Sequence, residues 1–215
     1  MVLAKICGIQ NAKDAAAAAA AGADALGFHV DLNGGRSPLF VSDAARIISG
    51  LPANVSSVVV TSATDAEKLT KLAQKTGAKI LQLYGDATPE AIQTVKGALP
   101  AIEIWKVVNV SGAESIEKAK TYDGVADAIA LDKAQNPMVR GGSGQTIDWN
   151  IAKKIVEAVS TPVILAGGLN PENLVEAIWT VQPYGVDVNS GVSNPDGSKD
   201  LEKVRLFVER TKSAA

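Results

Sequence analysis

The chain of 215 residues contains one cysteine and one histidine. A single cysteine cannot form an internal disulfide, which fits a reducing compartment. The formal net charge is −2, so the sequence lacks the basic excess of proteins that bind nucleic acid or anionic membrane surfaces. It also lacks any run of about 18 apolar residues that could span a membrane. We therefore expect neither a nucleic-acid partner nor a membrane partner.

Familiar cofactor motifs are missing as well. There is no P-loop, and the histidine, cysteine and carboxylates do not have the spacing of metal ligands. We expect no metal and no cofactor. The first residues, 1–5, lack a basic segment followed by a long apolar stretch, so we expect no signal peptide and a cytoplasmic location.

The composition that remains is that of a globular protein, with 47% hydrophobic and 20% charged residues. A chain of this length can bury one sizeable core. No linker or break in composition divides the sequence, so a single domain over residues 1–215 is expected.

Short β-branched runs recur along the chain, and each is followed by a segment of helical composition. Strands of a parallel sheet are buried on both faces and read as continuous apolar runs, so this alternation predicts βα units. Eight such units fit a small (β/α)8 barrel, whose typical size is about 250 residues. The candidate strands span residues 3–7, 25–30, 56–61, 79–84, 102–108, 126–131, 162–166 and 186–189.

A doubly wound open sheet is the alternative α/β architecture. That fold usually carries the pattern G-x-G-x-x-G after its first strand. Here the first turn reads Cys7-Gly8-Ile9-Gln10-Asn11, which does not match it. The favoured fold class is therefore α/β, a single-domain (β/α)8 TIM barrel.

Glycine-rich segments follow the sixth, seventh and eighth candidate strands. In a barrel, the loops after strands seven and eight often bind phosphate, because glycines let backbone N–H donors approach the anion. One such segment alone would be read as a tight turn. Together they predict a site for a phosphorylated small-molecule substrate, built from residues 141–146, 166–170 and 190–192.

Cys7 ends the first candidate strand and Asp132 directly follows the sixth, so a barrel brings both to one mouth. A thiol and a carboxyl there could divide general-base and general-acid work. The base role needs a positive field that favours the thiolate, and the acid role needs a raised carboxyl pKa. Lys5 lies deeper on the same side of the strand and is not an obvious source of that field. Otherwise Cys7 would be a small buried hydrophobe and Asp132 a helix or loop cap.

Motifs along nearly the whole chain resemble, in order, the phosphoribosylanthranilate isomerase family of tryptophan biosynthesis. They are KICGI at 5–9, GADALGF at 22–28, QLYGD at 82–86, LD at 131–132, GGSGQTIDW at 141–149, AGGLNPEN at 166–173 and VDVNSGV at 186–192. The resemblance implies a (β/α)8 barrel that needs no metal or organic cofactor. It also implies the conversion of N-(5′-phosphoribosyl)anthranilate into 1-(2-carboxyphenylamino)-1-deoxyribulose 5-phosphate by an Amadori rearrangement.

The resemblance also implies roles for individual residues. Cys7 would be the general base that takes the C2′ proton, and Asp132 the general acid that protonates the ring oxygen. Asp187 would face the amino-linked aromatic part of the substrate. Because members of this family occur as monomers, dimers or fused domains, we expect a monomer or a homodimer. The residues expected to bind the phosphate are Gly142, Gly144, Gly167, Gly168, Ser190 and Gly191.

Three positions depart from the family pattern. Leu39 stands where the family usually has the arginine that meets the anthranilate carboxylate, after an apparent insertion at 31–35. Tyr84 replaces a histidine, and Asn189 replaces a serine. Leucine cannot pair with a carboxylate, so either an arginine from another loop replaces it or the substrate lacks that carboxylate. The residues expected at the aromatic end, besides Asp187, are Arg36, Arg140, Tyr84 and His29.

These departures leave alternatives open. One is a related barrel isomerase that acts on another phosphorylated sugar derivative, and Leu39 separates it from the first interpretation. Another is a non-catalytic protein that binds a phosphometabolite. Binding alone does not need both Cys7 and Asp132, so the presence of this pair argues against it. His29 either supplies a polar contact to the substrate or has no role.

Overall fold

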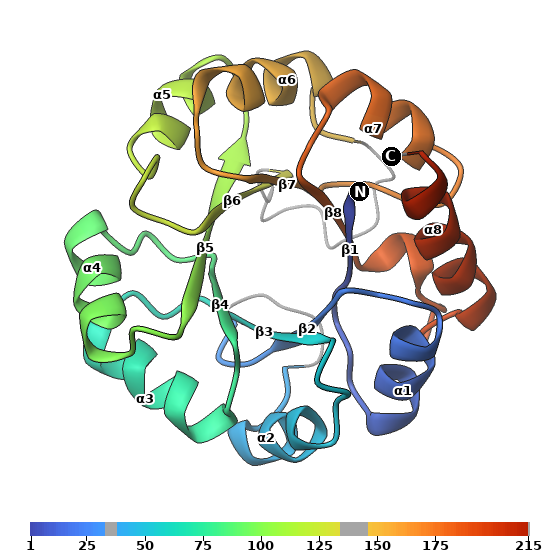
Figure 1. Ribbon diagram of the computed structural model, residues 1–215, viewed down its shortest axis with the longest axis horizontal. Coiled ribbons are helices and arrows are strands. Elements are labelled where there is room, and N and C mark those ends of the chain that lie inside the picture. Colours follow the sequence, from blue (N-terminus) through green and yellow to red (C-terminus); the bar gives the residue numbers. More distant parts are fainter. Residues whose placement is uncertain (33–37, 134–145, 215) are drawn as a thin grey trace.

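The computed structural model describes residues 1–32, 38–133 and 146–214. Within them, eight parallel strands form a closed barrel in chain order, with β8 paired to β1 (Figure 1). The closed ring confirms the predicted barrel and excludes the open doubly wound sheet. The strands are β1 (Leu3–Ile6), β2 (Ala25–His29), β3 (Ser56–Thr61), β4 (Ile80–Leu83), β5 (Glu103–Val110), β6 (Ala128–Lys133), β7 (Val163–Leu165) and β8 (Gly185–Val188).

A ring of helices surrounds the barrel in Figure 1. Side-chain caps start several of these helices where the sequence supplies an Asn, Thr or Asp: Asp65 accepts from the N–H of Lys68, and Asp200 accepts from that of Lys203. The helices are α1 (Ala12–Ala20), α2 (Val41–Ser49), α3 (Ala66–Thr76), α4 (Pro89–Ala98), α5 (Glu114–Lys120), α6 (Trp149–Ala158), α7 (Leu174–Val181) and α8 (Leu201–Ser213), with a short 3-10 helix η1 (Ser190–Val192) after β8. None of the helices in the described part of the chain is long and apolar enough to cross a membrane.

Successive side chains of each strand point to opposite faces, and the two faces have different neighbours. Outward residues such as Phe28 and Leu83 belong to the large core between the barrel and the helices. Inward residues form a second, smaller cluster, the inner cluster. Both faces are therefore buried, which explains why the strands read as continuous apolar runs. The buried members of the inner cluster are Cys7, Ala25, Val58, Val60, Ile80, Trp105, Val107, Ala128, Ala130 and Ile164.

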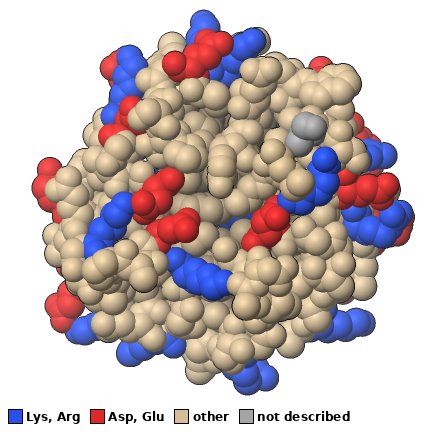
Figure 2. Space-filling view, in the orientation of Figure 1, with Lys and Arg blue, Asp and Glu red and all other residues tan. Residues whose placement is uncertain are grey.

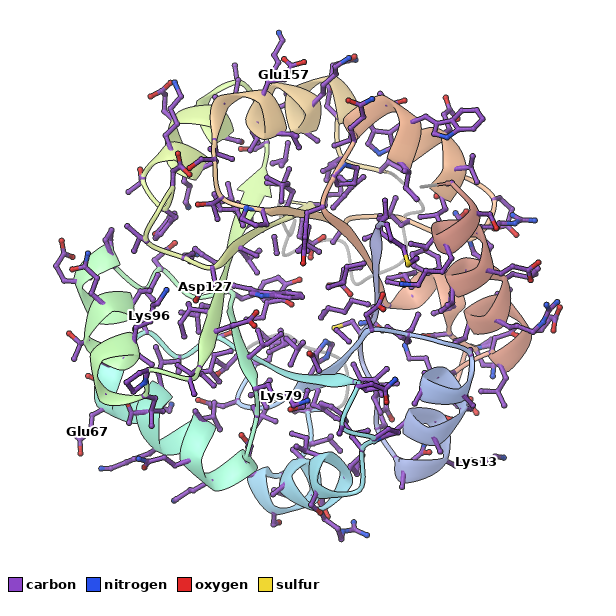
Figure 3. All side chains as sticks on the ribbon, viewed as in Figure 1. Lys13, Glu67, Lys79, Lys96, Asp127 and Glu157 are labelled. Atoms are coloured by element: carbon purple, nitrogen blue, oxygen red, sulfur yellow. The ribbon has the colours of Figure 1, made fainter. Side chains whose placement is uncertain are left out.

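Ion pairs and hydrogen bonds tie the segments before the strands to neighbouring helices and strands. Lys96 of α4 points toward Asp127, just before β6 (Figure 3), with 2.6 Å between Nζ and Oδ1. The other oxygen of Asp127 accepts from the N–H of Ile104 at 2.8 Å. On the face shown in Figure 2, positive and negative side chains lie close to one another, with no broad area of one sign. This amino-terminal end therefore stabilises the barrel, and the polar groups suited to chemistry lie at the other end.

Candidate active site

Cys7 directly follows β1, and its N–H continues the ladder by donating to the carbonyl of Val188 at 2.8 Å. The thiol is buried in the inner cluster, and its Sγ lies 3.4 Å from Nε2 of His29. Gly27 makes room for it, because a Cβ at this position would lie 2.6 Å from Sγ. The sulfur is therefore held at the carboxyl end of the barrel beside an imidazole.

Lys5 and Asp187 form a buried ion pair inside the barrel, with 2.6 Å between Nζ and Oδ2. A Cβ at Gly27 would approach Nζ of Lys5 to 3.1 Å, so the ammonium group and the sulfur of Cys7 border the same space. Lys5 is thus a positive charge close to the thiol, which the sequence did not clearly indicate.

The surroundings of Cys7 act on its ionisation in both directions. Burial raises the pKa of the thiol, whereas the positive charge of Lys5 lowers it. The carboxylate of Asp187 raises the pKa, and the contact with His29 lowers it. The net effect is a Cys7 pKa below its ordinary value, which favours the thiolate.

Asp132 lies near the end of β6, and both of its carboxylate oxygens accept hydrogen bonds. Oδ1 accepts from the N–H of Lys133 at 2.7 Å, and Oδ2 accepts from the hydroxyl of Tyr84. Burial raises the pKa of Asp132, and these two hydrogen bonds oppose it without cancelling it. The result is an Asp132 pKa above the ordinary range, as a proton donor needs.

Tyr84 lies close to the other polar groups at the mouth of the barrel. The negative charges of Asp132, Cys7 and Asp187 all act on its hydroxyl and raise its pKa, after the larger effect of burial. The barrel therefore brings the thiol, both carboxylates and the phenol into one region, although they come from β1, β6, β8 and β4. The hydroxyl of Tyr84 contacts Asp132, and the ring of His29 contacts Cys7. Both were expected at the aromatic end of the substrate.

The loops after β7 and β8 pack against each other. Gly167 and Gly168 have φ angles of 81° and 78°, a left-handed region that favours glycine. A Cβ at Gly191 would lie 2.0 Å from the carbonyl oxygen of Leu169, so only glycine fits where the two loops touch. Ser190 opens the 3-10 helix η1 in the second loop. These residues lie where the sequence predicts a phosphate site.

Lys199 is a buried cation that the sequence reasoning missed. Its Nζ donates to the side-chain oxygen of Asn189 at 3.0 Å and to Oγ of Ser193 at 2.9 Å. Burial lowers the pKa of Lys199 to about 8. A Cβ at Gly8 would lie 2.4 Å from the same oxygen of Asn189. Asn189, one of the departures from the family pattern, therefore joins the loop after β8 to the turn after β1.

The other positions singled out in the sequence do not add described residues to this group. Leu39 is half-buried and packs against the core between barrel and helices. Within the described residues, no group of three or more His, Cys, Asp and Glu could hold a metal ion. Four predicted site residues lie outside the described ranges: Arg36, Arg140, Gly142 and Gly144.

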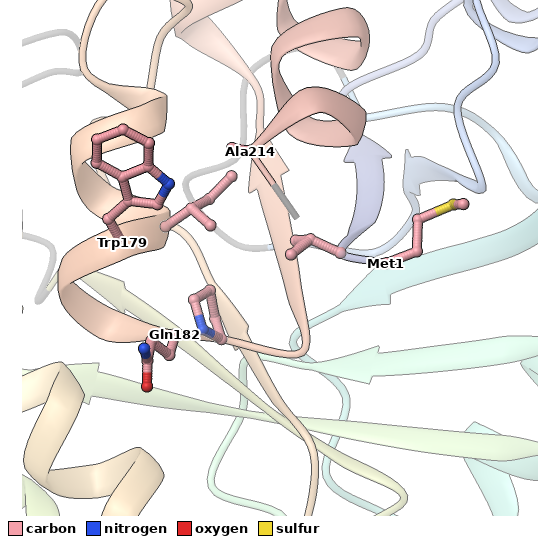
Figure 4. Close-up of a pocket in the computed structure, with 7 residues that line it drawn as sticks. Met1, Trp179, Gln182 and Ala214 are labelled. Carbon is pink, nitrogen blue, oxygen red and sulfur yellow. The ribbon is translucent and has the colours of Figure 1, made fainter.

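A shallow pocket lies away from these groups, where the chain enters β1 and β8 (Figure 4). It is lined by both ends of the described chain and by the end of α7. Trp179 at its edge is 70% exposed. This pocket contains none of the titratable groups gathered at the carboxyl end, so we assign no chemistry to it. Its lining residues are Met1, Val2, Ile178, Trp179, Gln182, Pro183 and Ala214.

Comparison with known proteins relates the fold and these groups to one family. Residues 4–210 match the family model of N-(5′-phosphoribosyl)anthranilate isomerase. The N-(5′-phosphoribosyl)anthranilate isomerase of Methanocella arvoryzae is 40% identical over 212 residues, which cover 99% of each protein. A crystal structure of monomers generated from the dimeric Thermotoga maritima isomerase aligns with a TM-score of 0.86 and 32% identity, covering 99% of this chain and 100% of that one. An isomerase crystallised with reduced 1-(o-carboxyphenylamino)-1-deoxyribulose 5-phosphate aligns with a TM-score of 0.85 and 32% identity, with the same coverage.

Proposed function

The chain belongs to the N-(5′-phosphoribosyl)anthranilate isomerase family, and from this we propose that Cys7 and Asp132 carry out the proton transfers of the isomerisation. The observation that carries the proposal is the opposite direction of their pKa shifts at one barrel mouth. The Cys7 pKa is lowered, which favours a base, and the Asp132 pKa is raised, which favours an acid. Paired groups tuned in this way are typical of acid–base active sites.

Ring opening is the first step. The bond between C1′ and the ring oxygen breaks, and Asp132 gives its proton to that oxygen as it leaves. The lone pair of the amino nitrogen forms a double bond to C1′, which gives an iminium ion. Because a raised pKa keeps Asp132 protonated closer to neutral pH, the carboxyl can supply this proton.

Proton removal from C2′ is the second step. The positive iminium nitrogen withdraws electrons and makes the C2′ proton acidic enough for a thiolate. Cys7 takes that proton, the electron pair forms the C1′–C2′ double bond, and the nitrogen becomes neutral. The resulting enol tautomerises to the 2-keto sugar. Lys5 and His29 support the thiolate state of Cys7 at the start of this step.

Substrate binding is proposed to divide between two sides of the mouth. The loops that contain Gly167, Gly168, Ser190 and Gly191 would bind the phosphate through backbone N–H groups, together with Gly142 and Gly144. Asp187 faces the interior next to Lys5, near the place proposed for the amino-linked ring. Arg36 or Arg140 would meet the anthranilate carboxylate, since Leu39 packs into the core.

We also propose a cellular location and an oligomeric state. Cys7 must remain a reduced thiol to act as a base, which fits a cytoplasmic location. We propose a monomer or a homodimer, because the described groups of the site all come from one chain and the Thermotoga maritima relative is named as dimeric.

Complementation of a tryptophan auxotroph that lacks this isomerase tests the proposed function. The wild-type gene should restore growth without tryptophan, whereas Cys7→Ala and Asp132→Asn should not. Western blots of the soluble fraction check that all three proteins accumulate equally. Failure of the soluble wild-type protein to restore growth, or growth with either variant, would contradict the proposal.

A further inference from the structure

Tyr84 and Asp132 lie 48 residues apart in the chain and are joined inside the barrel by a hydrogen bond. Tyr84 directly follows β4 and packs against the inner cluster, on the same side of the strand as Ile80. Asp132 points inward as Ala128 and Ala130 do. The tyrosine hydroxyl donates to Oδ2 of Asp132.

The second oxygen of Asp132 is held by backbone. Oδ1 accepts from the N–H of Lys133 at 2.7 Å, and a Cβ on Gly167 would lie only 3.3 Å from it. Oδ1 is thus packed against the loop after β7, while Oδ2 faces β4 and the interior. With each oxygen held by a different element, the carboxyl plane has one orientation, and Oδ2 is the oxygen available to a substrate.

We propose that Tyr84 is a positioning residue for the general acid, which holds Oδ2 of Asp132 in the direction of proton delivery, and is not a contact for the aromatic ring of the substrate. This inference rests on the proposed function of Asp132. An acid that must protonate one oxygen as a bond breaks depends on its orientation. A phenol suits the task because it donates a hydrogen bond without taking the proton from a carboxylic acid.

The ionisation of Tyr84 agrees with this role. Burial, and then the charge of Asp132, raise the pKa of the phenol well above its ordinary value, so the hydroxyl stays protonated and available as a donor. Its hydrogen bond stabilises the carboxylate and lowers the pKa of Asp132. Removal of the hydroxyl should therefore raise that pKa further.

Other groups around Asp132 also act on its pKa, and the test variant must leave them unchanged. Asp187 on β8 raises the Asp132 pKa, and Lys5 on β1 lowers it. Asn109 on β5, its neighbour in register, and Gly167 after β7 carry no charge. A substitution at position 84 that keeps the ring leaves the two charged neighbours in place.

Tyr84→Phe is the test variant, and Tyr122→Phe is its matched control. Tyr122 is also buried, and its hydroxyl donates to the carbonyl of Ala87 at 3.1 Å in the core between the barrel and the helices, outside the inner cluster. Each variant removes one buried hydroxyl and keeps the aromatic ring. A loss of stability common to both therefore reports the missing hydrogen bond and not the active site.

Carbon-13 NMR of the aspartate carboxyls, with the Asp132 signal assigned through Asp132→Asn, measures the pKa directly. We expect Tyr84→Phe to raise the Asp132 pKa by about one unit and Tyr122→Phe to leave it unchanged. An unchanged Asp132 pKa in Tyr84→Phe would overturn the inference. This titration needs no substrate, so it tests the action of Tyr84 on Asp132 separately from the proposed function.

Steady-state kinetics with N-(5′-phosphoribosyl)anthranilate separate the two roles of Tyr84. Misorientation of the acid predicts that Tyr84→Phe lowers kcat by about tenfold and leaves KM within about twofold. A contact with the aromatic part of the substrate predicts the reverse, an increase in KM at constant kcat. That reverse result would overturn the inference while leaving the proposed reaction intact.

Discussion

Lys5 and Asp187 are paired in register on β1 and β8, and their charged groups meet at 2.6 Å inside the barrel. Desolvation makes a buried ion pair a weak source of net stability. Its clearer effect is on Cys7, two residues after Lys5 on the same side of the chain. The ammonium group lowers the pKa of this thiol, against the larger effect of burial. The pair in the interior of the barrel thus acts on the thiol at its mouth.

The reactivity of Cys7 should depend on this pair. In the double variant Lys5→Met/Asp187→Asn both charges are gone, so the pH midpoint for alkylation of Cys7 by iodoacetamide should rise by about one unit. Lys96→Met is the control, because it removes a lysine from an ion pair of the same length at the opposite end of the barrel. Because Asp187 raises the thiol pKa and Lys5 lowers it, an unchanged midpoint in the double variant would show that the effect of Lys5 does not exceed that of Asp187.

The same residues predict a difference in stability. Lys5→Met alone leaves Asp187 buried and unpaired, which should lower the free energy of unfolding by about 3–5 kcal/mol. Lys96→Met breaks a partly exposed pair and should cost about 0–1 kcal/mol. Urea denaturation measures both. Adding Asp187→Asn to Lys5→Met should recover part of the loss, and no recovery would argue against an unpaired carboxylate as its cause.

The raised pKa of Asp132 predicts a particular pH dependence of stability. The folded state holds this proton more tightly than the unfolded state, so its contribution is present below the unfolded pKa and is lost as pH rises through the folded pKa. The unfolding free energy of the wild type, relative to Asp132→Asn, should therefore fall as pH rises from the unfolded aspartate pKa of about 3.9 through the folded pKa.

Asp123 provides a comparison of opposite sign for this experiment. Hydrogen bonds from Thr161, and then from Ser160, lower the pKa of Asp123. The stability that it contributes is present above the unfolded pKa and is lost as pH falls through the folded one. Relative to Asp123→Asn, the wild type should gain stability as pH rises from acid toward neutral. Equal slopes for the two comparisons would contradict the assigned directions.

The contact between the two glycine loops predicts the effect of a single methyl group. Gly191→Ala would place a Cβ 2.0 Å from the carbonyl oxygen of Leu169, so the loops after β7 and β8 must separate. We expect binding of inorganic phosphate, measured by calorimetry, to weaken at least about tenfold. In Gly97→Ala the Cβ meets nothing within 4 Å, and this helical substitution should leave phosphate binding unchanged. Equal affinity in both variants would exclude these loops as the phosphate site.

The fold could be predicted from the sequence because every strand is buried on both faces and every connection is a helix. The strand ends were less predictable. β5 runs to Val110 and β6 to Lys133, each two residues beyond the predicted end. Their pairing in register from Trp105 with Ala128 to Val110 with Lys133 stabilises these extensions, and pairing is a property of two segments together.

The candidate site could be predicted only in part, for a related reason. Cys7 and Asp132 could be predicted because both lie at the carboxyl ends of strands, and the barrel topology brings these ends together. Alternation put Lys5 on the side of Cys7, but Asp187, which pairs with Lys5 and also acts on the thiol, is adjacent only after β8 closes against β1. Tyr84 was expected at the aromatic end of the substrate, and the hydrogen bond of its hydroxyl to Asp132 could not be predicted from the sequence. Side-chain partners across the barrel are not encoded in the local pattern.

The central claim is that Cys7 and Asp132 divide the proton transfers, and the turnover of N-(5′-phosphoribosyl)anthranilate by their single variants tests it most directly. Each group should contribute about 10²–10⁴-fold to kcat. Cys7→Ala and Asp132→Asn should therefore each lower kcat by that factor, while inorganic phosphate binds to both as tightly as to the wild type. A kcat within about twofold of the wild-type value for either variant would contradict the account.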